Sequence, residues 1–147
     1  MARKYLPGTA RVLLGLVLLI TGVDKIFWFF FFQMPHMTPA LSAFMDALKA
    51  TGYYLPFIGI VEATGGALLL VNRFVPLGLT ILAPVLVNIL GVHTFLDTSG
   101  FPLAFILIAL DVYLAWVNRD AFRPMFVGRG VKVSRIAEPE GLKRALP

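Results

Sequence analysis

The sequence predicts an all-α integral membrane four-helix bundle, and three observations support this prediction. The 147 residues are 59% hydrophobic and only 14% charged. Four apolar runs approach or exceed the roughly 20 residues that an α-helix needs to cross about 30 Å of hydrocarbon. These runs lack the period-two alternation of a barrel strand, so helices are the structure that satisfies their backbone groups in lipid. The expected transmembrane helices cover about residues 9–32, 53–71, 74–95 and 101–117.

The first helix is expected to follow Pro7-Gly8 and to end in the aromatic run Phe27-Trp28-Phe29-Phe30-Phe31-Phe32. Aromatic residues concentrate at membrane interfaces, so this run predicts an interfacial belt. The alternative is a stacking platform for a planar ligand.

A short amphipathic helix is predicted in the loop that follows. Leu41, Phe44, Met45 and Leu48 repeat at spacings of three and four. Thr38 or Ser42 is a suitable N-cap, and Gly52 is a suitable end. We expect this helix to lie on the outer membrane surface or to fold over the bundle as a lid.

The transmembrane domain is expected to span residues 1–127, with residues 128–147 forming a basic, mobile cytoplasmic tail. Basic residues precede the first helix, occupy the turn after the second and follow the fourth: Arg3, Lys4, Arg11, Arg73, Arg119 and Arg123. By the positive-inside rule, both termini and that turn are cytoplasmic, and the amphipathic helix lies in the first outer loop. This distribution predicts a multi-pass protein of the cell inner membrane. The same distribution argues that the net charge of +5 does not serve to bind nucleic acid.

A layer of polar residues interrupts the apolar runs near the middle or outer half of the membrane. Its members are Asp24, Lys25, Glu62, Asn88 and Asp111. A charge at the bilayer centre costs at least about 2.5–3.5 kcal/mol, so these residues need a reason to be there. Lys25 can neutralise one acid, either Glu62 or Asp111. The layer is either a ligand site or an interhelical polar contact that holds the bundle together.

Small residues place Glu62 at a contact between helices. Gly59 and Gly66 flank it at spacings of three and four, and Gly15 and Gly22 give the first helix a similar stripe. Small side chains allow neighbouring helices to approach closely. We therefore expect Glu62 to point toward another helix and not toward lipid.

Several kinds of chemistry are excluded or disfavoured. The sequence contains no cysteine, which excludes thiol–disulfide exchange, cysteine-ligated iron–sulfur clusters and covalent c-type haem. The two histidines, His36 and His93, lack the spacing of a metal or bis-histidine haem site, so no metal is predicted. His93 is expected at the outer rim, where a structural role competes with a secondary role in the site.

The order of several short motifs resembles the DoxX family of small four-helix membrane proteins. The resemblance covers roughly residues 9–126. It is carried by the segments Gly22-Val23-Asp24-Lys25, Gly59-Ile60-Val61-Glu62, Asn72-Arg73-Phe74 and Tyr113-Leu114-Ala115-Trp116. It implies the fold and the lysine and glutamate of the first two transmembrane helices. Some relatives are linked to membrane redox systems, but no residue here supports sulfur oxidation.

The leading hypothesis is therefore an intramembrane site for a lipophilic carbonyl ligand such as a quinone. Lys25 or a protonated carboxyl group would donate to the carbonyl, and Trp28, Phe29 or Phe31 would cover the ring. The alternative is a non-catalytic accessory or scaffold subunit that binds a membrane protein partner. Transport is a weaker third hypothesis, because four helices leave little room for a pathway without a homo-oligomer. We do not expect the chain to be an enzyme by itself.

Overall fold

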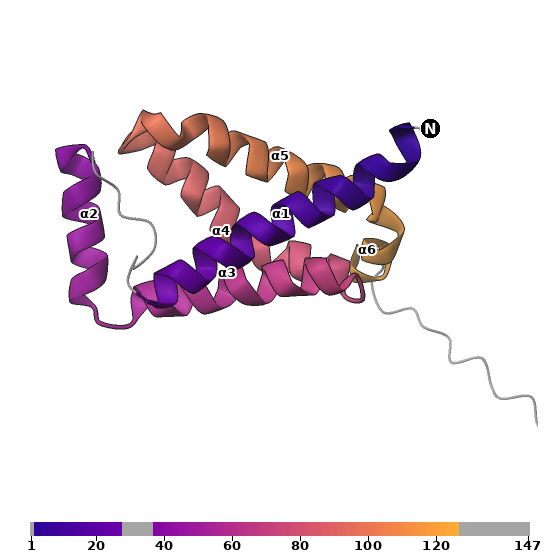
Figure 1. The fold of residues 1–147 in the computed structure, drawn as a ribbon, viewed down its shortest axis with the longest axis horizontal. Helices are drawn as coiled ribbons and strands as arrows, with labels where there is room; N and C mark the ends of the chain where they lie inside the picture. The colour runs from indigo at the N-terminus through magenta and orange to yellow at the C-terminus, as the bar shows by residue number, and fades with distance from the viewer. Residues whose placement is uncertain (1, 28–36, 127–147) are drawn as a thin grey trace, which may run out of the picture.

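The computed structural model describes residues 2–27 and 37–126, and every regular element within them is helical. The elements are α1 (Ala2–Ile26), α2 (Pro39–Ala50), α3 (Tyr54–Val71), α4 (Val75–Phe95), η1 (Thr98–Gly100), α5 (Phe101–Val117) and α6 (Arg119–Phe126) (Figure 1). Four segments are long and apolar enough to cross a membrane: Leu6–Ile26, Tyr54–Val71, Val75–Phe95 and Thr98–Val117. The predicted all-α membrane bundle is confirmed.

The first transmembrane helix begins at Ala2, earlier than the expected start at residue 9. It runs through Pro7, which has no N–H to donate to the carbonyl of Arg3. The helix can include this proline because only a bond near its end is lost. Its last residue is Ile26, and the expected extension through residues 28–32 lies outside the described residues.

The turn between α3 and α4 uses a left-handed residue. Asn72 has φ 60° and caps α3, a conformation that asparagine adopts more readily than most residues. Arg11 Nη1 on α1 donates to the carbonyl of Leu69 at 2.7 Å, which satisfies one acceptor in the last turn of α3. This hydrogen bond links the last turn of α3 to the N-terminal half of α1.

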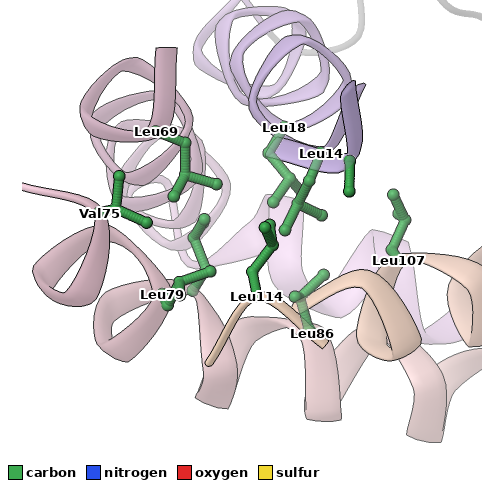
Figure 2. Packing of buried hydrophobic residues seen from close by; sticks show 10 residues of the cluster. Leu14, Leu18, Leu69, Val75, Leu79, Leu86, Leu107 and Leu114 are labelled. Atoms are coloured by element: carbon green, nitrogen blue, oxygen red, sulfur yellow. The ribbon is translucent and has the colours of Figure 1, made fainter. Parts of the chain in front are cut away.

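The four long helices pack in the cyclic order α1, α3, α4, α5. The most extensive interface joins α1 to α3, and α5 packs against both α4 and α1. The core at their centre is made largely of leucine, as Figure 2 shows for Leu14, Leu18, Leu69, Leu79, Leu86, Leu107 and Leu114. This order places α1 diagonally opposite α4.

Apolar side chains also cover the outer surface of the bundle. Val87, Phe105 and Val112 are all more than half exposed, at 60%, 56% and 62%. Large exposed apolar side chains on the transmembrane helices suit contact with lipid tails.

The predicted amphipathic helix is present as α2, and it lies across one end of the bundle (Figure 1). Thr38 caps it, since its hydroxyl accepts from Leu41 N at 3.2 Å and donates to the Leu96 carbonyl at 2.6 Å. At the other end Gly52 has φ 75°, which glycine adopts without a steric penalty. Of the two expected caps, Thr38 is the one used.

The short helix α6 was not predicted. It lies at the opposite end of the bundle from α2 (Figure 1), and Phe122 packs against the core. Next to it, the Arg119 guanidinium lies 5.5 Å from the ring centroid of Trp116, an arrangement suited to a membrane interface.

Candidate functional site

The site begins with a close contact between α1 and α3. A Cβ atom added to Gly22 would lie 2.5 Å from Ala63 N, and one added to Gly59 would lie 2.5 Å from the Gly22 carbonyl oxygen. Farther along, a Cβ on Gly66 would lie 2.7 Å from the Gly15 carbonyl oxygen. Two glycine pairs seven residues apart therefore bring the helix backbones together, as the small-residue pattern predicted.

Glu62 is buried in this α1–α3 contact and forms an ion pair. Its exposed fraction is 0%, and Oε2 lies 2.7 Å from Lys25 Nζ. Thr21 Oγ1 donates to the same oxygen at 3.2 Å. A buried carboxylate is tolerated when it is paired and hydrogen-bonded, and the structure selects Glu62 over Asp111 as the partner of Lys25.

A cavity of about 410 Å³ adjoins this ion pair, within the usual size range of small-molecule sites. It occupies the half of the bundle nearest α2, between α1, α3, α4 and α5. Most of its lining is apolar. The four apolar residues of α2 close one side: Leu41, Phe44, Met45 and Leu48. The α2 helix thus forms the lid that the sequence offered as one of two alternatives.

Polar groups reach the cavity from two sides. On the α1 and α3 side they are Thr21, Asp24, Lys25 and Glu62, and from α4 and η1 they are Asn88, His93 and Ser99. The Lys25 side chain remains 18% exposed although its ammonium is paired with Glu62. An apolar cavity with a few convergent polar groups is the usual form of a small-molecule site.

His93 is held at the α4 side by two contacts. Its Nδ1 lies 3.1 Å from the Asp97 carbonyl oxygen. Its ring lies against Gly100, where any Cβ atom would collide with it. The ring is therefore fixed in orientation by the turn that connects α4 to α5.

Asp97 stabilises the same turn. Its carboxylate accepts from Ser99 N at 2.9 Å. Hydrogen bonds with Ser99 hold the pKa of Asp97 below its ordinary value, with a smaller lowering from the Thr38 backbone and from nearby His93. The N-terminus of the lid, His93 and the α4–α5 turn thus meet at one place.

Comparison with known proteins assigns the chain to a family. The family model described as DoxX matches residues 7–94. The chain belongs to the DoxX family. Over 132 residues it is 31% identical to the uncharacterized protein YwoB of Bacillus subtilis strain 168, and the match covers 84% of each chain. No solved structure matches this DoxX protein significantly.

The remaining predicted site residues of the DoxX protein do not all lie at the cavity. Asn88 lines the cavity but is exposed. Asp111 is buried, at 5% exposed, yet it is absent from the cavity lining, and its Oδ1 has no hydrogen-bond partner within the described residues. Trp28, Phe29 and Phe31 lie outside the described residues.

Two further features of the site were missed from the sequence. Thr21 was not singled out, although it lies four residues before Lys25 and so on the same helix face. The contribution of the α4–α5 turn through Ser99 and Gly100 had no distinctive signal, because a Ser-Gly turn is common. Within residues 2–27 and 37–126, no group of three His, Asp or Glu side chains could hold a metal ion.

Proposed function

We propose that this DoxX protein binds a lipophilic, quinone-like ligand in the cavity under α2, as part of a membrane redox system. The observation that supports the proposal best is that Lys25, whose side chain stays 18% exposed although it is paired, lines a largely apolar cavity. An ammonium has three N–H donors, and Glu62 accepts one of them. In this proposal a ligand carbonyl accepts another of them.

The ion pair also explains how such a donor is kept inside a membrane. Glu62 is fully buried behind Lys25 and compensates its charge, while Thr21 donates to the carboxylate. The ligand therefore meets a donor whose charge is already balanced. Its ring and tail contact the apolar side chains of the lid and of α3, including Phe44, Leu48 and Leu55.

Binding is tested with the protein purified in mild detergent, examined by native mass spectrometry and absorption, and then titrated with decylubiquinone. We expect saturable binding to the wild type and a loss of about tenfold or more for Lys25→Met, because a charge-assisted hydrogen bond is removed. Asp111→Asn is the matched control, since it removes a buried acid outside the cavity and should leave affinity unchanged.

Two results would contradict the proposal. One is a wild type that carries no copurified ligand and shows no saturable binding of the quinone. The other is a folded Lys25→Met variant with wild-type affinity. Either would favour the accessory-subunit alternative, in which the polar residues only stabilise the bundle.

We further propose that both termini are cytoplasmic, so that α2 and the cavity lie in the outer half of the inner membrane. Because the chain has no cysteine, single cysteines at the exposed Ala43 of α2 and Ala121 of α6 report on the two ends of the bundle. In intact cells an impermeant maleimide should label Ala43→Cys and spare Ala121→Cys. The reverse pattern would overturn this orientation.

A further inference from the structure

The interface between α3 and α4 is tight in the part of the bundle farther from α2. A Cβ atom added to Gly65 would lie 2.5 Å from the Leu82 side chain. One added to Gly78 would lie 3.1 Å from the Gly65 carbonyl oxygen. These contacts identify the faces that α3 and α4 turn toward each other.

The same two faces border the cavity nearer to α2. Ile58 precedes Gly65 by seven residues, about two helical turns, so it lies on the same face of α3. Val92 follows Gly78 by fourteen residues, about four turns, so it lies on the corresponding face of α4. Both Ile58 and Val92 line the cavity. The cavity therefore extends between α3 and α4 at this level.

The two helices diverge toward α2, and α4 contains a proline where this happens. Pro84 follows Leu82 by two residues, and a proline inside a helix removes a backbone hydrogen bond and bends the helix. In Figure 1, α3 and α4 lie together near the turn that joins them and separate toward α2. By contrast, α1 stays close to α3 beside Ile58, because a Cβ atom on the adjacent Gly59 would lie 2.5 Å from the Gly22 carbonyl oxygen.

Asn88 indicates that the cavity reaches the outer surface of the bundle between these helices. It lies four residues before Val92 and so on the same side of α4. Leu86, two residues earlier, points to the opposite side and is buried in the core at 1% exposed. Asn88 itself is exposed, yet it lines the cavity. A residue on the outer side of α4 that also lines the cavity lies at the edge of an opening.

We infer that the cavity opens to the bilayer between Ile58 of α3 and Asn88 and Val92 of α4, and that the hydrocarbon chain of the ligand leaves the bundle there. A cavity of about 410 Å³ suits a ring with the first part of a chain. A longer chain must leave it, and the surrounding lipid is an apolar environment for that chain. This inference rests on the proposed function and specifies its ligand class, a ring that carries a long isoprenoid or alkyl chain.

The test compares two ubiquinones with the same ring, one with two isoprene units and one with ten, bound to the full chain in nanodiscs. Affinities are expressed per mole of lipid, because the longer chain partitions more strongly into the bilayer. We expect the wild type to bind both quinones with similar affinity. Binding of the short quinone alone would mean that the cavity is closed toward lipid and would overturn the inference.

Two pairs of substitutions locate the opening. Ile58→Trp narrows it from α3, and Ile60→Trp is the matched control, because Ile60 is 55% exposed and does not line the cavity. Asn88→Trp narrows it from α4, with the neighbouring Val87→Trp as control at 60% exposed. We expect Ile58→Trp and Asn88→Trp to weaken binding of the long quinone relative to the short one by about tenfold or more. Neither control should change that ratio.

The outcomes distinguish this inference from the proposed function. Leu103 of α5 also lines the cavity and is 56% exposed, so the rival route passes α5. If Leu103→Trp lowers the ratio and folded Ile58→Trp and Asn88→Trp variants do not, the chain does not leave between α3 and α4 and the inference is wrong. Absence of binding of both quinones to the wild type would overturn the proposed function as well.

Discussion

Replacing Gly22 by alanine is expected to force α1 away from α3 and to destabilise the whole bundle. The new Cβ would lie 2.5 Å from Ala63 N and 2.7 Å from the Gly59 carbonyl oxygen. Both are backbone atoms of a helix, so no side-chain rotation can relieve the contact. Overpacking of this kind typically costs about 1–3 kcal/mol. We expect a cost near the upper end of that range, because the contact is so close.

The measurement is the thermal unfolding midpoint of each variant in the same detergent, monitored by far-UV circular dichroism. Gly91→Ala in α4 is the matched control, because a Cβ atom there meets nothing within 4 Å. A helical glycine replaced by alanine without a clash gains stability, by about 0.5–1 kcal/mol. If both variants unfold at the same temperature, the close α1–α3 contact is not a determinant of stability.

The same substitution should also impair the candidate site. Lys25 and Thr21 on α1 reach Glu62 on α3 across this contact, at 2.7 Å and 3.2 Å. Hydrogen bonds weaken quickly beyond these distances, so a small separation of the helices would remove both. The glycines therefore set the geometry of the ion pair as well as the packing.

Much of this arrangement follows from local sequence pattern. Gly59 and Gly66 flank Glu62 on one helix face, which predicts a close helix contact, and the structure confirms that contact with α1. Likewise, the spacing of Leu41, Phe44, Met45 and Leu48 predicts α2, and each of these residues lines the cavity. In both cases the residues lie on one face of a helix, and their spacing in the sequence determines directly which residues share that face.

Whether a buried polar residue reaches the cavity is harder to predict. Counting residues from the membrane surface gives depth, and depth placed Asp111 in one layer with Glu62. Asp111 shares its face of α5 with Ala104 and Leu107, which line the cavity, but it lies one turn farther from α2 and is buried without lining the cavity. The extent of the cavity depends on how side chains of several helices pack together, which no local sequence pattern predicts.

The helix α6 illustrates a second limit of sequence pattern. It has eight residues and contains Pro124, so it has little intrinsic tendency to form. Its position depends on Phe122, which packs against the core. The α6 helix is therefore stabilised by a contact between residues distant in sequence, which no local sequence pattern predicts.

The second large effect concerns the ion pair, and Lys25→Met should be strongly destabilising. It leaves Glu62 buried at 0% exposure without its cation, a change that typically costs about 3–5 kcal/mol. Glu62→Gln should cost less, because the Lys25 side chain is 18% exposed and keeps access to the cavity. The readout is the unfolding midpoint of the ligand-free protein at one pH.

The double variant Lys25→Met/Glu62→Gln separates stability from binding. With both charges removed, no uncompensated carboxylate remains, so most of the stability lost in Lys25→Met should return. Quinone binding should not return, since the donor on the cavity wall is gone. Recovery of both properties would mean that Lys25 serves only to neutralise Glu62, whereas a Lys25→Met protein as stable as the wild type would mean that the buried pair does not stabilise the fold.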